Sequence, residues 1–186
     1  MQLVFFLEEA SAKALLQELL PRLLPAHITP FFVVFEGKQD LEKQLPRKLR
    51  AWQRPECRFV VLRDRDGGDC RIIKERLKTL CREGGKEDVL IRIVCRELES
   101  WYLGDLAAVT TTLEAESTAA RQNSRKFRDP DALDNPKQEL KKLVPSYEQI
   151  AGSRQLGRVM DLQHNLSHSF NCFLSGLQRI VHEQKQ

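Results

Sequence analysis

The chain has 186 residues, enough for one well-filled domain or for a core domain with a modest appendage. Its 30 Lys and Arg against 26 Asp and Glu give a net charge of +4, too mildly basic to indicate nucleic-acid binding by itself. The five cysteines include no CxxC pair, so neither a zinc knuckle nor a disulfide framework is indicated. The apolar run at residues 3–7 lacks a basic leader and is too short to span a bilayer, so we expect a soluble cytoplasmic protein with no membrane partner.

Four apolar, β-prone runs occur in the first half of the chain, at residues 3–7, 31–35, 59–62 and 89–95. Helix-sized segments separate them. Leucines at helical spacing predict helices over residues 11–24 and 41–52, and a third apolar stripe at residues 72–80 ends before Gly84 and Gly85. This alternation predicts an α/β fold with a mainly parallel four-stranded sheet flanked by helices.

The second half of the chain reads as helical. Residues 101–120 predict a helix, and residues 121–136 are polar and contain Asp129-Pro130 and Asn135-Pro136, as is typical of a loop. Further helical stretches are expected over residues 137–144 and within residues 156–181. We therefore expect residues 1–120 to form the α/β core and residues 121–186 a helical extension packed on it, in a single compact domain.

Two aspartates end the third apolar run, spaced by one residue. Because alternate residues of an extended segment point the same way, Asp64 and Asp66 can aim at one point. Two carboxylates on one point suit a hard divalent cation such as Mg²⁺. The alternative is an ordinary turn, since Asp-Gly-Gly-Asp at residues 66–69 is good turn chemistry whatever the function.

Acidic residues also follow the first and fourth runs. These are Glu8 and Glu9 after the first, and Glu97 and Glu99 after the fourth. In a parallel sheet the carboxyl ends of the strands lie on one edge, so Glu8, Asp64, Asp66 and Glu97 or Glu99 would come within reach of one another. Two alternatives stay open. Each acid could be a first-turn helix preference, or the acids could be neutralised in an ion-pair network by Arg63, Arg65 and Arg96.

Converging carboxylates repel one another, and bound Mg²⁺ or Mn²⁺ would offset that repulsion. One or two such ions could polarise a phosphodiester, lower the pKa of an attacking water and stabilise the leaving oxygen. Lys38, which follows Gly37 at the end of the second run, lies near the same predicted edge. It could stabilise charge on a phosphate in the transition state, or it could be a turn lysine in solvent.

Several basic residues could neutralise a nucleic-acid backbone near this edge. Arg47 and Lys48 lie in the second predicted helix, and Arg121, Arg125 and Lys126 lie in the polar loop. The alternative for each group is a solvated charged surface.

A glutamate after the first strand, an Asp-x-Asp after the third and an acid after the fourth resemble the TOPRIM fold of topoisomerases, primases and OLD-type nucleases. The chain more closely resembles the TOPRIM-like family called domain of unknown function 4276, over nearly its whole length. Glu-Leu-Glu-Ser-Trp at residues 97–101 combined with Asp64-Arg65-Asp66 carries this resemblance most specifically. Residues 7–11, 37–41, 135–137 and 167–173 support it.

The resemblance implies that Glu8 is the catalytic or metal-binding glutamate and that Asp64 and Asp66 bind the metal. It also implies that Glu97 or Glu99 completes the site. Many TOPRIM domains place Gly directly after the first glutamate, and glycine lets the backbone approach a phosphate closely. This chain has Glu9 at that position, so the resemblance does not extend to standard phosphate handling. Members of the family are often encoded beside ABC-like or OLD-like ATPases in bacterial defence loci, which implies an ATPase protein partner.

These observations together predict a Mg²⁺- or Mn²⁺-dependent nuclease, or a nuclease subunit, that cleaves phosphodiester bonds of DNA or RNA in bacterial anti-phage defence. The alternative is a non-catalytic TOPRIM-like binding or regulatory subunit of an ATPase complex.

Overall fold

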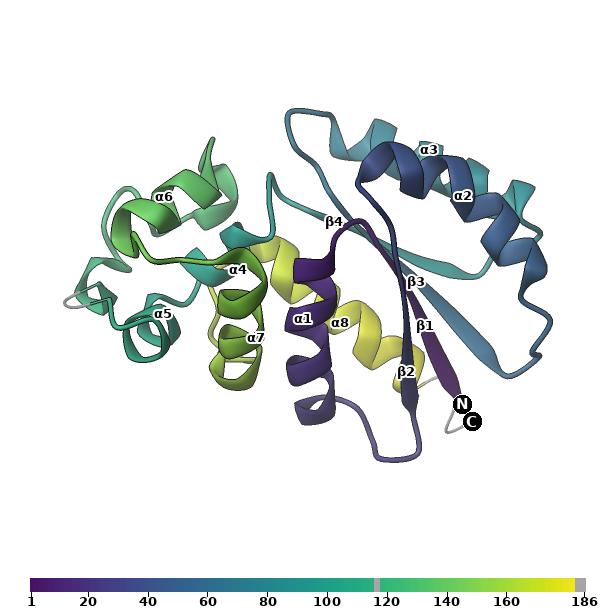
Figure 1. Ribbon diagram of the computed structural model, residues 1–186, viewed down its shortest axis with the longest axis horizontal. Helices are drawn as coiled ribbons and strands as arrows, with labels where there is room; N and C mark the ends of the chain where they lie inside the picture. The colour runs from purple at the N-terminus through teal and green to yellow at the C-terminus, as the bar shows by residue number, and fades with distance from the viewer. Residues whose placement is uncertain (116–117, 183–186) are drawn as a thin grey trace.

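A computed structural model of the chain describes residues 1–115 and 118–182. Its centre is a four-stranded sheet of β1 (Gln2–Leu7), β2 (Thr29–Val34), β3 (Cys57–Asp64) and β4 (Val89–Val94). The strands are all parallel and stand in the order β2-β1-β3-β4. The expected α/β fold with a parallel sheet flanked by helices is therefore confirmed (Figure 1).

The strand order reverses between β1 and β3. The chain passes from β1 outward to β2, returns across β1 to β3, and continues to β4. In open parallel sheets, ligands bind beyond the carboxyl ends of the strands at such a reversal. The residues that follow β1 and end β3 are Glu8 and Asp64, so the topology places both at this point.

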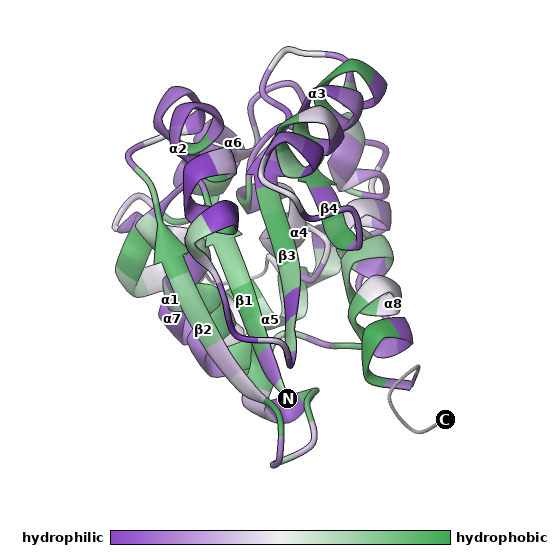
Figure 2. Cartoon of the chain, turned by 90° about the vertical axis from the view of Figure 1, so that its right-hand side faces the viewer, coloured by the Kyte–Doolittle hydropathy of each residue, from purple (hydrophilic) through white to green (hydrophobic). Residues whose placement is uncertain are grey.

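Helices cover both faces of the sheet because the strands are apolar on both sides (Figure 2). On one face, α2 (Lys38–Ala51) and α3 (Cys70–Glu83) bury their leucine stripes against Val4, Phe6 and Val61. On the other, α1 (Ala10–Leu19) and the C-terminal helices pack against alternate residues of the same strands, such as Phe5 and Val60. A short 3₁₀ turn, η1 (Leu20–Arg22), continues α1.

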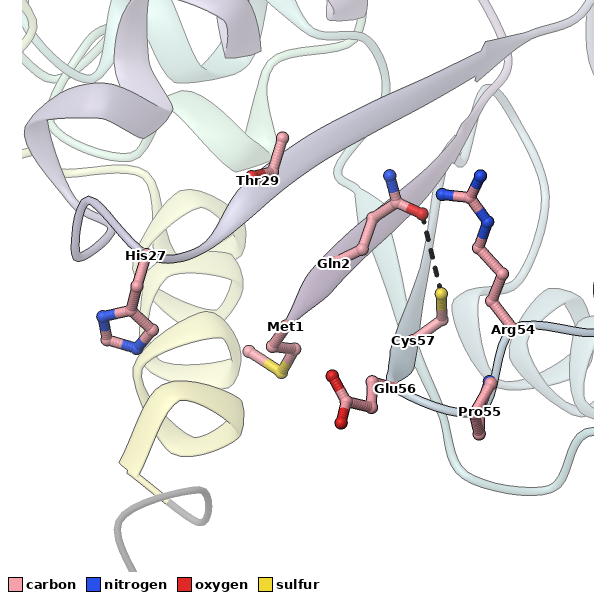
Figure 3. Close-up of a pocket in the computed structure, with 8 residues that line it drawn as sticks. All are labelled: Met1, Gln2, His27, Thr29, Arg54, Pro55, Glu56 and Cys57. Atoms are coloured by element: carbon pink, nitrogen blue, oxygen red, sulfur yellow. Dashed lines mark hydrogen bonds between the residues drawn. The ribbon is translucent and has the colours of Figure 1, made fainter.

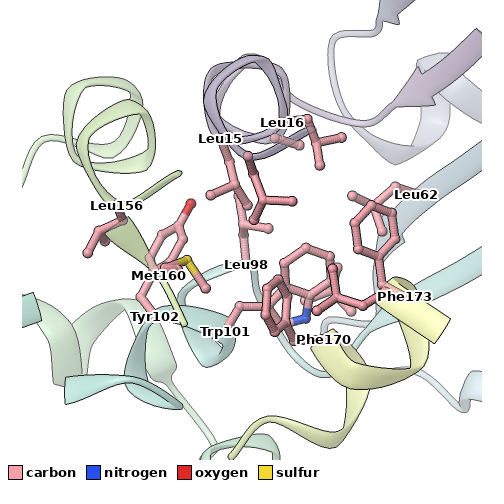
Figure 4. Packing of buried hydrophobic residues seen from close by; sticks show 14 of the residues in the cluster. Leu15, Leu16, Leu62, Leu98, Trp101, Tyr102, Leu156, Met160, Phe170 and Phe173 are labelled. Carbon is pink, nitrogen blue, oxygen red and sulfur yellow. The ribbon is translucent and has the colours of Figure 1, made fainter. Parts of the chain in front are cut away.

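The second half of the chain forms five helices with two short 3₁₀ turns in the described residues. The helices are α4 (Glu99–Leu103), α5 (Leu106–Thr112), α6 (Pro136–Leu143), α7 (Gln149–Val159) and α8 (His168–His182). The turns are η2 (Ala119–Arg121) and η3 (Pro130–Ala132). The large core around Trp101, Tyr102, Phe170 and Phe173 joins these helices to α1 and the sheet (Figure 4).

The helix predictions for the second half were wrong in two details. The single helix expected over residues 101–120 breaks after Leu103, because Asp105 caps α5 by accepting from the backbone N–H of Ala108 at 3.0 Å. Residues 116 and 117 of that expectation lie outside the described residues. The one stretch expected somewhere within residues 156–181 corresponds to α8, whereas α7, which begins at Gln149, was not predicted.

The extension is seated directly on the core, with α7 against α1 and α8 against β4. Gly157 makes the first contact possible, since a Cβ there would lie 2.5 Å from the Leu15 carbonyl oxygen. Among the described helices, none combines the length and apolarity required to cross a membrane.

Candidate functional site

Glu8 and Asp64 meet at the point where the strand order reverses. Glu8 is buried, and its Oε2 accepts a hydrogen bond from the backbone N–H of Asp64 at 3.1 Å. This bond ties the residue that follows β1 to the last residue of β3. The parallel register of the two strands, Leu7 opposite Leu62, brings about this contact.

The charges of several other acids act on the Asp64 carboxylate. Asp64 is half-buried, and within residues 1–115 and 118–182 its carboxylate has neither a hydrogen bond nor an ion pair. Burial raises its pKa well above the ordinary value, and the negative charges of Glu8, Glu99, Glu9 and Asp66 raise it further. The charges of these acids act on Asp64, while their convergence on one ion stays a prediction.

Burial also raises the pKa of Glu8, and the charge of Asp66 adds to that effect. The hydrogen bond from the Asp64 backbone and the nearby Arg63 guanidinium oppose it. Glu8 and Asp64 are therefore two neighbouring carboxyls that each hold a proton more readily than in water.

Asp66 forms an ion pair with the first residue of α2. Its backbone is left-handed, with φ 53°, a conformation that Asp tolerates better than most residues, and its N–H donates to the Arg96 carbonyl at 2.9 Å. Its Oδ2 lies 2.7 Å from Nζ of Lys38, the first residue of α2. Gly37 caps this helix at φ 94°, where a side chain would be strained. The hydrogen bond with Asp66 raises the pKa of Lys38.

The two glutamates after β4 have different surroundings. Glu99 is 1% exposed, accepts from the Tyr147 hydroxyl at 3.1 Å, and has a pKa raised by burial. Its charge acts on Asp64. Glu97 instead accepts from the Lys137 backbone N–H at 3.0 Å, at the first turn of α6. Of the two alternatives, Glu99 is the one electrostatically linked to the Asp64 carboxylate.

The arginines form only part of the ion-pair network considered as an alternative. Arg63 is buried, with Nη1 2.7 Å from Oε1 of Glu42 and Nε 3.9 Å from Oε2 of Glu8. Arg96 pairs with Asp134 at 2.8 Å, and Arg65 Nη1 approaches the Cys70 sulfur at 4.0 Å. Arg63 thus offsets part of the charge at Glu8, while no arginine in the described residues pairs with Asp64.

Polar residues of the extension complete the surroundings of the acids, and the sequence patterns did not single them out as site residues. Gln149, the first residue of α7, donates to Oε2 of Glu9 at 2.9 Å and accepts from Lys137 Nζ at 2.8 Å. Lys137 belongs to the Asn-Pro-Lys segment that supported the family resemblance. Tyr147 and Gln149 had no such signal, because only the packing of α7 on α1 brings them to this edge.

The basic residues expected to contact nucleic acid have varied surroundings. Arg47 donates to Gln44 at 3.2 Å, and Lys48 is exposed, some ten residues, or about 15 Å, along α2 from Lys38. In the loop, Lys126 pairs with Glu139, and the Arg121 guanidinium lies 5.3 Å from the Phe127 ring centre. Arg125 is exposed. Contact of these residues with nucleic acid stays a prediction.

The carboxylates at this edge have the chemistry that binds a divalent cation, but among the described residues their positions do not form a binding site. Carboxylate oxygens suit Mg²⁺ or Mn²⁺, and a cation would relieve the repulsion that raises the pKa of Asp64. In the part of the chain that the structure describes, however, no three His, Cys, Asp or Glu side chains are arranged to hold a metal ion. The carboxylate of Asp66 is occupied by Lys38, and that of Glu97 by α6.

A cavity of about 510 Å³ lies at the opposite end of the sheet (Figure 3). It is lined by residues from the starts of the strands and the segments before them, among them Gln2, His27 and Cys57. The strand-end acids do not contribute to it.

Comparisons with known proteins agree with this fold. The model of a family described as Domain of unknown function (DUF4276) matches residues 7–178. A solved structure, the C-terminal region of the Burkholderia pseudomallei OLD protein, is similar with a TM-score of 0.53 and 19% sequence identity. That similarity covers 96% of this chain and 98% of the other. No curated protein matches the sequence.

Proposed function

This chain belongs to the DUF4276 family, and from that membership and the crowded acids at its sheet edge we propose that it is a TOPRIM-type nuclease, or the nuclease subunit of a complex. It would cleave phosphodiester bonds of DNA or RNA with Mg²⁺ or Mn²⁺. The Asp64 carboxylate is the observation that carries this proposal. It stands at the topological reversal, surrounded by acids and unpaired in the described residues, where a cation would be most stabilising.

The acids would divide the work according to their surroundings. Asp64 and Asp66 would be ligands, Glu8 a ligand or general acid/base, and Glu99 an auxiliary ligand; Glu97 is the less favoured candidate because α6 engages its carboxylate. A bound divalent cation would polarise the phosphodiester and lower the pKa of an attacking water. The raised pKa of Glu8 is a shift in the direction that suits a carboxyl acting as general acid or base.

Lys38 has a double role in this proposal. Its ammonium now neutralises Asp66, so Asp66 becomes available as a ligand only when Lys38 releases it. The freed ammonium, at the first turn of α2, could then contact a phosphate oxygen and stabilise its developing charge.

A nuclease assay with matched variants tests the proposal. Purified protein with Mn²⁺ should cleave labelled single-stranded or duplex DNA or RNA, and Asp64→Asn should abolish cleavage. Asp88→Asn makes the same change directly before β4, at the opposite edge of the sheet, where Asp88 pairs with Arg58. This control variant should cleave normally. Equal activity of Asp64→Asn and the wild type would rule out the role of Asp64.

A non-catalytic binding or regulatory subunit of an ATPase complex is the second candidate. It is favoured by the lack of a ready ligand arrangement in the described residues. The likeness to a region of an OLD protein motivates testing an ABC-like or OLD-like ATPase as partner, and a role in anti-phage defence. The regulatory candidate predicts no cleavage with or without that ATPase, and protection against phage that survives Asp64→Asn.

A further inference from the structure

We propose that a groove beside β4 binds the phosphate backbone of a single nucleic-acid strand and guides it to the strand-end acids. This inference rests on the proposed nuclease function and names its substrate path. The groove has a volume of about 540 Å³ and lies between α3, the edge strand β4 and α8. The lining residues used in the argument are Arg71, Lys74, Ile91, Arg92, Ile93 and Cys95.

The residues that line the groove carry positive charge. Its lining includes Arg71, Lys74 and Arg92 and no Asp or Glu. None of the three forms an ion pair within the described residues, and burial, with the charge of nearby Arg179, lowers the pKa of Arg92. Such a concentration of unpaired cations attracts a polyanion.

The exposed edge of β4 adds backbone donors to these charges. The Arg65 N–H donates to the Val94 carbonyl at 2.9 Å, so even-numbered residues of β4 face β3. By strand alternation, the N–H groups of Ile91 and Ile93 point away from the sheet, on the side of the groove. Backbone N–H groups are common donors to phosphate oxygens.

The same edge is unsuited to pairing with another β-strand, which would need donors and acceptors in alternation. The Ile91 carbonyl already accepts from Arg92 Nη1 at 3.0 Å, and the Cys95 N–H already donates to Ser169 Oγ at 3.3 Å. Arg92 is held in place by a second bond, from Nε to the Cys172 carbonyl at 2.9 Å. Cations, and two N–H groups with no acceptor within residues 1–115 and 118–182, favour an anionic ligand over a peptide strand.

One end of the groove lies beside the acids. Cys70 and Cys95 line it; Cys70 follows the loop that carries Asp66, and Cys95 directly precedes Arg96. The Asp66 N–H donates to the Arg96 carbonyl at 2.9 Å, which joins that loop to the residue after Cys95. The nearby Asp131 carboxylate is engaged by the hydroxyls of Ser167 and Ser169 and by the Ser169 N–H. A strand lying in the groove would therefore leave it next to Asp66.

The size and floor of the groove favour a single strand over a duplex. Its volume is that of a pocket for a small ligand, which gives room for one or two nucleotides. Ile93, which is half-buried, provides an apolar part of the floor that unpaired bases can contact, whereas a duplex turns its bases inward.

Fluorescence anisotropy with a labelled oligothymidylate tests the inference without cleavage, in EDTA and in an Asp64→Asn background. The double variant Arg71→Ala/Lys74→Ala should weaken binding about tenfold and reduce the slope of log K against log salt by about 1.4, as expected for two lost phosphate contacts on a single strand. The control Arg82→Ala/Arg154→Ala removes two exposed charges from the last turn of α3 and from α7, outside the groove, and should bind within twofold of its parent.

Three results would overturn the inference: no oligonucleotide binding by the parent, equal weakening by the Arg82→Ala/Arg154→Ala control, or binding of duplex as tightly as single strand. Arg71 is exposed and Lys74 half-buried, neither is ion-paired in the described residues, and circular dichroism would verify folding. Because binding is measured without metal, groove-dependent binding by a protein that cleaves nothing would retain the inference and reject the nuclease proposal.

Discussion

Replacing Asp64 by Asn should stabilise the metal-free protein. The substitution keeps the shape of the side chain and removes a charge that is half-buried, unpaired in the described residues and surrounded by acids. An ionised group left without partners costs about 1–3 kcal/mol or more. We expect Asp64→Asn to recover about 1–2 kcal/mol of this, a rise in Tm of about 2–8 °C for a chain of this size.

The gain should depend on pH with a defined sign. The folded-state pKa of Asp64 is raised, so the protonated carboxyl contributes fully to folding stability below about pH 4. That contribution is lost as the pH rises through the folded-state pKa and the carboxyl ionises. Thermal unfolding in EDTA should therefore show Asp64→Asn and wild type converging in acid and separating toward neutral pH. Mn²⁺ at a hundred times its Kd should stabilise the wild type by about 2.7 kcal/mol and leave Asp64→Asn nearly unchanged.

Two outcomes would refute this reasoning. A lower Tm for Asp64→Asn at neutral pH would mean that the carboxylate has a stabilising partner. An equal Mn²⁺ shift in both proteins would mean that any bound ion lies elsewhere.

Three further substitutions test the surroundings of the site. Lys38→Ala should change the free energy of unfolding by less than about 0.5 kcal/mol, because the ion pair of Lys38 with Asp66 is exposed. The same substitution should tighten Mn²⁺ binding in calorimetry, because it frees the Asp66 carboxylate. Weaker binding would contradict the proposal that Lys38 must release Asp66 before Asp66 can bind the ion. Tyr147→Phe removes the donor to buried Glu99 and should cost about 1–3 kcal/mol in urea unfolding, whereas no loss would mean that Glu99 is satisfied otherwise. Gly157→Ala should lower the free energy of unfolding by about 1–3 kcal/mol, because the new Cβ would press against α1. The control Gly67→Ala should leave it nearly unchanged, because no atom lies within 4 Å of the new Cβ. Equal effects of the two substitutions would refute the close packing of α7 on α1.

The strands and the edge that carries the acids could be predicted from the sequence because they depend on local pattern. Apolar runs separated by helix-sized segments predict a parallel sheet, and parallel strands place Glu8 and Asp64 on one edge whatever their order. The strand order itself could not be predicted. It is the order β2-β1-β3-β4 that makes β1 and β3 neighbours and lets Glu8 accept from the Asp64 backbone.

The remaining details depend on contacts between distant segments. Glu97 and Glu99 are equivalent in the sequence, and only the positions of α6 and Tyr147 distinguish them. The break before α5 has a similar origin. Asp105 caps that helix and also accepts from the Asp161 N–H at 2.7 Å, a contact across 56 residues that periodicity does not show.

Diffraction from crystals grown with Mn²⁺, measured for its anomalous signal, tests the central claim most directly. The account predicts an anomalous peak at the carboxyl ends of β1 and β3, with carboxylate oxygens of Asp64 and Glu8 about 2.0–2.6 Å from the ion and Asp66 released from Lys38. A crystal saturated with Mn²⁺ that shows no peak at this edge, or a peak without Asp64 as a ligand, would contradict it.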